Sequence, residues 1–466
     1  MMDFNRKIRF GVLAESYDLE WWQHETIKSL TDNGIDLVLT EPDIDPGTAA
    51  SLDFILSFKK GNIGSDIMRS PRFGVWGFCF PGIREFMRKT PKSTVTLCQL
   101  NDDKDKTLII KQLHLNTIFH SYRFHRDRML KEAAILPLQA CKDLIVNGKL
   151  ETKILQEAIT TAPTPSTLQM FACFWICLWR RLVFNVNYLF RQEDWNIGYF
   201  TKPDDIHWLK PPKSDYFADP FVIATDKDTY LFFEWFSNKK GKAELAMAKK
   251  SENFEVYHKI TNFHEHHSYP YVFDYQGQIY CIPEANQTNK VSLYRFLETD
   301  GLASLKLDSD LLQGKYVDTT LFIHDNKFYL FTTPQNQPHT HLLIFVADDL
   351  RGPYRQHFNN PVKVDCSNSR MAGKIRKIDG DLIRPAQNST RHYGESITLN
   401  KIVQLDEYQY IEETIIEIKP DKKWTYDKGI HTINSDGGIT VFDAKRFTFT
   451  WRGFVQQIRQ KTTKKL

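Results

Sequence analysis

The sequence lacks the features that most directly indicate a function. Its 61 Lys and Arg are nearly balanced by 57 Asp and Glu, and a formal net charge of +4 is small for 466 residues. Nucleic-acid binding relies on a strong local excess of positive charge, so it gains no support here. No GxGxxG or Walker pattern occurs, so a nucleotide-binding fingerprint is missing as well.

Cysteine motifs are also missing. The seven cysteines form no CxxC pair, and Cys173 and Cys177 stand four apart without a nearby His or Asp. This pattern indicates reduced thiols in the cytoplasm and not a disulfide framework. His266 and His267 closely precede Tyr269, but no third ligand follows at a zinc-site spacing. We therefore expect a cytoplasmic protein with no metal and no cofactor.

Long hydrophobic runs are scarce. Residues 1–16 (MMDFNRKIRFGVLAES) have no long apolar core, which predicts a first strand and no signal peptide. In the segment 168–190, Arg180 and Arg181 end an apolar run that is too short to span a bilayer. Two interpretations of this helix stay open: it docks between domains, or it lies in a membrane surface. The second would bring the protein peripherally to the inner membrane surface.

The chain is too long for one ordinary core, and its patterns change along its length. Strand-like apolar runs alternate with helical spacing at the start, which predicts an open, mainly parallel α/β sheet. A Pro/Thr-rich stretch at 160–167 is the clearest break. The predicted regions are an α/β domain at 1–150, a linker with an aromatic and basic helix at 151–194, an all-β domain at 195–456 and a basic tail at 457–466.

The first region resembles the folate-dependent formyltransferase domain over roughly residues 6–145. The resemblance rests on the order strand, helix, DFILSF, PRFGVWGF and TVTLCQLNDDKDKTLII. That family carries Asn-x-His after its strand, where this chain has Gly77 and Cys79. Its later Asp-x-Gly matches only at Asp105, since Thr107 replaces the glycine. Formyl transfer needs a proton acceptor and an oxyanion stabiliser, so the resemblance implies a formyltransferase-like fold without activity.

From residue 195 onward, a hairpin-like unit recurs. Its first copy, residues 215–236 (DYFADPFVIATDKDTYLFFEWF), has two apolar runs joined by a polar turn. A polar residue, here called the register mark, precedes the first run of five such units at intervals of 50, 49, 52 and 61 residues. This period predicts a five-bladed β-propeller, in which residues 195–200 supply a missing outer strand and close the ring. The register marks are Asp219, Tyr269, Asp318, Arg370 and His431.

The register marks should meet at one mouth of the propeller, because the innermost strands line its channel. Acidic residues facing each other there would suit glycosidic chemistry, with one carboxyl protonated and the other ionised. Each residue alone has a structural alternative; Asp219, for example, could cap a turn. The catalytic candidates are Asp219, Asp318 and Glu284. The substrate-binding candidates are Glu234, Tyr269, His267, Arg370, Gln387 and His431.

The propeller region also resembles a known family. ADPF, SYPYVF…IPEA, DTTLF and SRMAG…LIRPAQ…YGESITLNKI are similar to the five-bladed propeller at the N-terminus of glucosamine inositolphosphorylceramide transferases and their bacterial relatives. More distantly, ADPF with two later acids is similar to arabinanase- and invertase-like glycosidase propellers. In those glycosidases, acidic residues on the first blades carry out catalysis. The resemblance implies the same role here for Asp219, Asp318 and Glu284. Tyr269 stands where the second blade could offer an acid, which disfavours hydrolysis.

The resulting hypothesis is a glycosyltransferase-like enzyme of surface-glycan or glycolipid biosynthesis. Sugar transfer at the propeller mouth would use a glycan, a sugar nucleotide or a glycolipid, with Arg370 holding a phosphate or a carboxylate. Two alternatives stay open. The protein could be a non-catalytic glycan-binding scaffold, or it could be a glycoside hydrolase.

Overall fold

The computed structural model describes residues 7–59, 63–101, 107–155, 165–260, 265–297, 302–451, 453–455 and 457–458. The chain separates into two compact units, the first ending at Val183 and the second beginning at Phe184. Asp105, most of the predicted break at 160–167 and the predicted tail from residue 459 onward lie outside the described residues.

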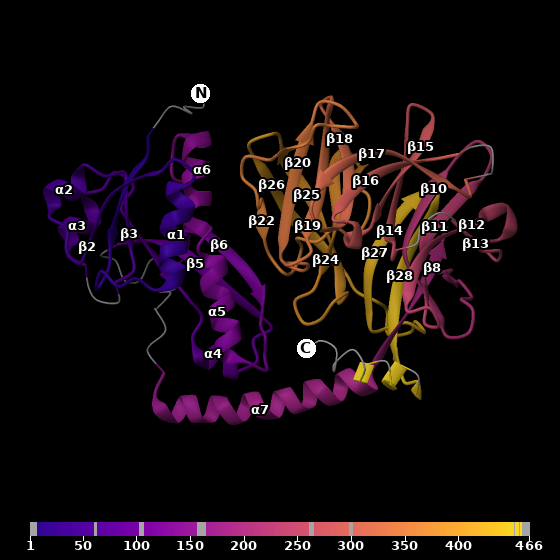
Figure 1. Ribbon diagram of the computed structural model, residues 1–466, viewed down its shortest axis with the longest axis horizontal. Coiled ribbons are helices and arrows are strands. Elements are labelled where there is room, and N and C mark those ends of the chain that lie inside the picture. Colours follow the sequence, from indigo (N-terminus) through magenta and orange to yellow (C-terminus); the bar gives the residue numbers. More distant parts are fainter. Residues whose placement is uncertain are drawn as a thin grey trace. The chain divides into compact units, whose positions relative to one another are not determined.

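A seven-stranded sheet in the order β2-β1-β3-β4-β5-β6-β7 forms the centre of the first unit (Figure 1). Strands β1 to β4 pair in parallel, whereas β5, β6 and β7 add to the sheet in antiparallel fashion. The predicted α/β sheet is therefore present, but it is mixed and not mainly parallel. The short connection between β5 and β6 leaves no room for a crossover helix. The strands are β1 (Arg9–Leu13), β2 (Asp36–Glu41), β3 (Phe54–Ser57), β4 (Val75–Cys79), β5 (Lys92–Leu100), β6 (Thr107–Asn116) and β7 (Lys153–Leu155).

Several helices pack against this sheet, and two of their ends show common capping arrangements. The Ser121 hydroxyl accepts the Phe124 N–H at the start of α5, and Gly148 closes α6 with a left-handed φ of 70°. The helices are α1 (Trp21–Thr31), α2 (Pro46–Ala50), α3 (Ser65–Arg69), α4 (Ile83–Met87), α5 (Tyr122–Ala133), α6 (Leu136–Asn147) and α7 (Thr167–Phe190).

Five antiparallel sheets make up the second unit, one for each blade, so the predicted five-bladed propeller is confirmed. Each hairpin turn returns the chain to its neighbouring strand, as the first unit at 215–236 predicted. The blades are β10 (Asp215–Ala224), β11 (Thr229–Ser237), β12 (Lys242–Lys249) and β13 (His258–Lys259); β14 (Ser268–Tyr275), β15 (Gln278–Glu284), β16 (Lys290–Phe296) and β17 (Leu305–Gln313); β18 (Tyr316–His324), β19 (Lys327–Pro334), β20 (His341–Ala347) and β21 (Arg355–Gln356), with β22 (Lys363–Val364) also on β20; β23 (Arg376–Ile378), β24 (Asp381–Asn388), β25 (Ser396–Leu405) and β26 (Tyr410–Ile418); and β27 (Gly429–Asp436), β28 (Ile439–Thr448), β8 (Gln192–Phe200) and β9 (His207–Trp208).

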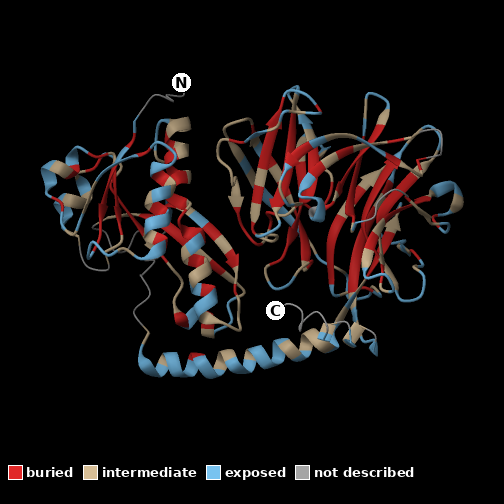
Figure 2. Cartoon of the chain, in the orientation of Figure 1, coloured by how far each residue is buried: buried red, intermediate tan, exposed pale blue. Residues whose placement is uncertain are grey.

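The fifth blade closes the ring with strands from both ends of the unit. Strand β28 pairs with β8 from Thr440↔Phe200 to Thr448↔Gln192, so the outer strand predicted at 195–200 is confirmed. Closure replaces two exposed sheet edges by a paired ladder. Apolar side chains fill the space between blades; Phe221, Phe232 and Phe331 are completely buried, and Figure 2 shows the blades buried along most of their length.

Helix α7 contrasts with the rest of the chain because it is largely exposed (Figure 2). It continues for 24 residues, past the two arginines that were expected to end its apolar run. In length and composition it is the one helix of the described residues that could cross a membrane, with a mean hydropathy of 1.2 and only 6% of its apolar window buried. The sequence-based judgement that this segment is too short was therefore wrong.

Candidate active site at the propeller mouth

The inner strands of four blades carry a β-bulge at the register mark. The pairing shifts in β10 at 218–221, in β14 at 268–271, in β18 at 317–320 and in β27 at 430–433. Asp219, Tyr269 and Asp318 adopt positive φ values of 51°, 43° and 51°, which are unfavourable for residues with a Cβ. A bulge of this kind re-aims a side chain and persists only where its surroundings hold it.

Carboxylates from the preceding blade hold these bulges. The Asp219 N–H donates to Asp443 Oδ2 at 2.9 Å, across the junction of blades five and one. The Tyr269 N–H donates to Asp219 Oδ2 at 3.2 Å, and the Asp318 N–H donates to Glu284 Oε2 at 3.2 Å. Three successive junctions of the ring are thus joined at the mouth by hydrogen bonds from a backbone N–H to a side-chain carboxyl oxygen.

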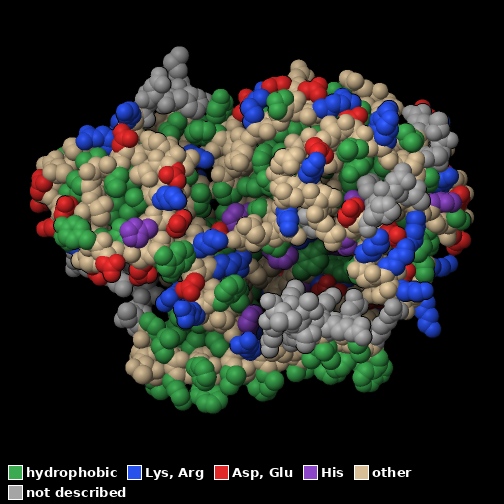
Figure 3. Space-filling model, in the orientation of Figure 1, with side chains coloured by type: hydrophobic (Ala, Val, Ile, Leu, Met, Phe, Trp, Pro, Cys, Tyr) green, Lys and Arg blue, Asp and Glu red, His purple; other side chains and the backbone are tan. Residues whose placement is uncertain are grey.

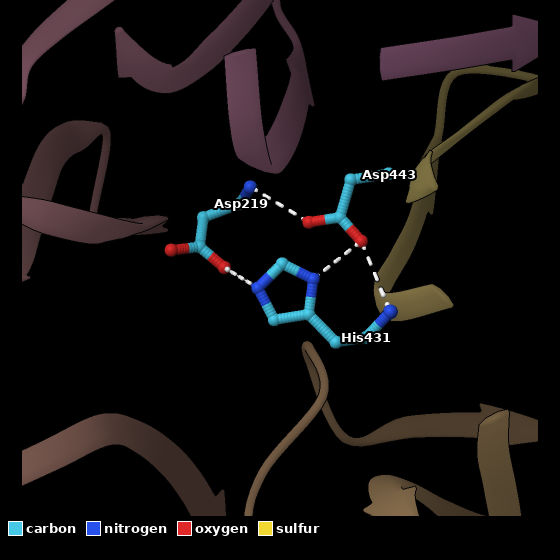
Figure 4. A group of neighbouring side chains, drawn as sticks. All are labelled: Asp219, His431 and Asp443. Atoms are coloured by element: carbon cyan, nitrogen blue, oxygen red, sulfur yellow. Dashed lines mark hydrogen bonds and ion pairs between the residues drawn. The ribbon is translucent and has the colours of Figure 1, made fainter. Parts of the chain in front are cut away.

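An imidazole ring lies between two of these acids (Figure 4). His431 Nδ1 is 2.7 Å from Asp443 Oδ1, and His431 Nε2 is 3.2 Å from Asp219 Oδ1. Burial alone would lower the pKa of His431, but the charges of Asp443 and Asp219 raise it to about 10. The ring is therefore an imidazolium at neutral pH. The trio is compact enough for a metal ion, but a metal would have to displace a proton from the ring.

Asp219 and Glu234 form a pair of unlike acids in blade one. Burial raises the pKa of Glu234 well above its ordinary value, and the charge of Asp219 adds to this shift. Burial also acts on Asp219, but the His431 imidazolium and the Thr432 hydroxyl, which donates to Asp219 Oδ1 at 2.9 Å, hold the pKa of Asp219 below its ordinary value. One acid of the pair keeps a proton and the other is ionised.

A second pair of acids joins blades two and three. Burial and then the charge of Asp318 raise the pKa of Glu284 to about 8, although Arg370 opposes the shift. Arg370 binds Asp318 through two nitrogens, with Nε 2.5 Å from Oδ2 and Nη2 3.2 Å from Oδ1. Gln387 Nε2 donates to the same Oδ2 at 2.7 Å. Glu284 is therefore a partly exposed, protonated carboxyl beside a firmly anchored one.

The structure brings the predicted acids together and shows what several of the predicted substrate-binding residues contact. Tyr269 is completely buried and its hydroxyl bonds Thr320, so the ring packs in the core and only its N–H faces the acids. Arg370 and Gln387 both bind Asp318, and their part in substrate binding stays a prediction. His267 lies before β14, where its N–H bonds the Ala243 carbonyl of blade one.

Sequence reasoning missed four residues of the mouth. Asp443 stands twelve residues after its register mark, opposite the bulge at 430–433, whereas the position that pairs as Glu234 does in blade one is Ala444. A search for acids anywhere on the second strand of each blade would have found it. Trp195 lies 4.2 Å from the His431 ring, and the Tyr393 ring lies 5.1 Å from the same ring. Thr432 directly follows a mark.

In the first unit, the positions matched to formyltransferase residues lie on β4. Gly77 is paired on both sides, with Ser57 and with Cys98. Cys79 is buried, with its sulfur 3.3 Å from that of Cys98. The aromatic rings of Trp22, Phe58, Phe78 and Phe80 pack together near the carboxyl ends of the parallel strands, where a ligand was expected. The formyltransferase resemblance stays a prediction.

Comparisons with known proteins bear on the propeller. Residues 210–437 match the family model described as "Glucosamine inositolphosphorylceramide transferase 1, N-terminal". The protein of that name from Oryza sativa subsp. japonica is 27% identical over 251 residues, 50% of this chain and 34% of the rice protein. The protein of that name from Arabidopsis thaliana is 29% identical over 208 residues, 43% of this chain and 27% of the plant protein.

The match therefore spans about a third of these relatives' length or less. Among solved structures, a family 117 glycoside hydrolase from the marine bacterium Zobellia galactanivorans aligns with 55% of this chain and 91% of its own, at 14% identity and a TM-score of 0.36. The resemblance of the propeller to the N-terminal region of glucosamine inositolphosphorylceramide transferases, predicted from its motifs, is confirmed.

Proposed function

We propose that this protein transfers a sugar in the biosynthesis of a surface glycan or glycolipid and that the reaction takes place at the propeller mouth. The observation that supports the proposal is the pair of unlike carboxyls in neighbouring blades, with protonated Glu284 on one side and ionised Asp219 on the other. Groups whose surroundings separate their pKa values in this way are suited to act as acid and base.

The mouth would divide the chemistry among its acids. Glu284 would donate a proton to the leaving oxygen as the bond to the anomeric carbon breaks. Asp318 would accept the proton of the attacking hydroxyl, and Asp219 would stabilise the positive charge that develops on the sugar ring. His431 and Arg370 would act as positioning residues, since each binds one of these carboxylates.

The substrate class follows from the relatives' names and is part of the proposal. Their printed name refers to glucosamine and inositolphosphorylceramide, so we take a sugar nucleotide as donor and a phosphoinositol-containing lipid as acceptor. The proposal also places the chain in the cytoplasm, in keeping with seven free cysteines, and assigns no activity to the first unit.

One observation favours a second function, a glycan-binding scaffold. Asp219, Glu284 and Asp443 each accept a backbone N–H across a blade junction, so these acids would be needed for the ring even without catalysis. A scaffold would bind glycan at the mouth and leave it unchanged.

A transfer assay distinguishes these functions. The full chain is incubated with a panel of uridine-diphosphate sugars and inositolphosphorylceramide in detergent micelles, and lipid products are measured by mass spectrometry. We expect a glycosylated lipid whose rate falls about 10²–10⁴-fold in Glu284→Gln, and no change in Glu413→Gln, a matched variant of an exposed acid on β26. Glycan binding without product would replace transfer by the scaffold function, and release of free sugar from a glycoside would replace it by hydrolysis.

A further inference from the structure

Helix α7 has two faces of different character. In the first unit, Cys173 is buried against Ile83 and Phe86 of α4, and Cys177 packs beside it. Arg180 continues this face and donates to the carbonyls of Phe86 and Met87 at 3.1 and 2.7 Å. Positions 173, 177 and 180 lie on one side of a helix, so this side is fixed to the first unit.

The opposite side is apolar and uncovered. At about 100° per residue, the large exposed apolar side chains between Phe171 and Leu182 lie within an arc of roughly 140°, centred away from Cys173 and Arg180. Figure 3 shows hydrophobic side chains gathered along this helix. The exposed residues include Phe171, Phe174, Trp175, Leu178, Trp179 and Leu182, each between 49% and 61% exposed except Trp179 at 65%. So wide and continuous an apolar surface is exceptional on a soluble protein.

In the second unit, aromatic side chains gather at the residue where the helix ends. Phe190 packs on Phe449 and Phe454, with ring centroids 5.8 and 5.4 Å apart. Beside these rings, Trp451 is 73% exposed and Val455 is 45% exposed. Aromatic side chains at the end of an apolar helix are typical of the boundary between lipid and water.

The charged residues near α7 favour a lipid surface over a protein groove as the partner of its apolar side. No Asp or Glu occurs between residues 158 and 192, and Arg181 and Arg191 are exposed at the edge of the apolar surface. A helix bound in a protein groove needs only a narrow apolar stripe, whereas a helix lying in a bilayer surface exposes a broad apolar face with cations beside it. We propose that α7 lies in the plane of a membrane surface rich in anionic phospholipid and holds the protein there.

The same contacts argue for an orientation in the plane and against a span. Arg180 and Arg181 stand near the middle of the helix, where a spanning helix would place two guanidinium groups in the hydrocarbon core. Arg180 would also have to leave the two carbonyls of α4. In the plane, Arg180 keeps its partners, Arg181 reaches the headgroups and the apolar face enters the lipid to a depth of about 5–10 Å.

Vesicle flotation of the full chain tests this inference. We expect the protein to float with vesicles of phosphatidylcholine and phosphatidylglycerol, more weakly with phosphatidylcholine alone, and to be released by alkaline carbonate. Trp175→Asp combined with Trp179→Asp should reduce binding at least about tenfold. The matched control, Ile415→Asp combined with Ile416→Asp, alters exposed apolar residues of β26 and should leave binding intact.

Three outcomes would overturn the inference: a wild-type protein that stays with the soluble fraction, equal flotation of the two double variants, or resistance to carbonate, which marks a spanning helix. Circular dichroism of each variant confirms that it is folded. The inference does not depend on sugar transfer, because flotation is measured without donor or acceptor.

Discussion

The propeller holds two buried clusters of charged side chains, and they are built differently. In blade four, Glu412 binds Arg384 through both oxygens, at 2.6 and 2.8 Å, and Lys363 at 2.7 Å. Burial opposes ionisation, but Arg384 and Lys363 lower the pKa of Glu412 to about 2. At the mouth, burial and a neighbouring acid instead raise the pKa of Glu234 and Glu284.

The difference is one of charge balance. The blade-four cluster has two cations around one carboxylate, so its acid is fully paired and the cluster serves the fold. At the mouth, the ion pairs found among the described residues supply two cations, Arg370 and His431, for five acids, so some acids must retain protons. Such an excess of acids is unfavourable for folding and useful for proton transfer. The excess acids are Asp219, Glu234, Glu284, Asp318 and Asp443.

The largest effect is expected from removing the carboxylate of the blade-four cluster. Glu412→Gln leaves the fully buried Arg384 without its counter-charge, and we expect the free energy of unfolding to fall by about 3–5 kcal/mol. Urea denaturation followed by tryptophan fluorescence measures this. A loss similar to that of an exposed control would show that the two clusters are not different in kind.

The next largest effect is expected from His431, one of the two cations at the mouth. His431→Gln removes the imidazolium between Asp219 and Asp443, at a cost of about 1.5–3 kcal/mol near neutral pH. A histidine whose pKa rises from 6.5 to about 10 on folding contributes its full stabilisation of the folded state below pH 6.5. This stabilisation is lost as the pH rises to 10. Stability of the wild type should therefore decline more steeply across this range than that of the variant. Parallel curves would contradict the ion-paired arrangement.

A smaller effect on the pH dependence of stability is expected from the proton that Glu284 holds. The folded state raises this pKa from 4.5 to about 8, so the folded protein binds the extra proton and its stability decreases as the pH rises between these values. The slope contributed by one such group is at most about 1.4 kcal/mol per pH unit. Glu284→Gln should remove this slope while retaining an acceptor for the Asp318 N–H. An unchanged slope would mean that Glu284 is ionised.

The smallest effect is the control in blade four. Glu413→Gln, next to Glu412 in sequence but exposed, should leave the unfolding midpoint and the pH profile unchanged. Differential scanning fluorimetry at several pH values provides the comparison. A shift similar to that of Glu412→Gln would attribute the loss to β26 in general and not to the buried ion cluster.

Much of the fold could be predicted from the sequence because it depends on local repeats. A period near fifty residues gave the blade count, and the polar residue before each first run identified Asp219 and Asp318. The mixed sheet of the first unit was missed, since β5 and β6 have strand patterns that do not reveal direction. Asp443 was missed because it stands one residue before Ala444, the position that pairs as Glu234 does in blade one.

The sequence by itself identified four of the five acids at the mouth, all but Asp443, since a repeating strand pattern fixes where each side chain starts. Only the tertiary structure decided their protonation and partners. Asp443 and Asp219 are 224 positions apart, yet one binds the backbone of the other. A pKa depends on burial and on charges within a few ångströms, and ring closure brings those charges together from opposite ends of the domain. The exposure of α7 likewise became visible only once one of its sides was packed against α4.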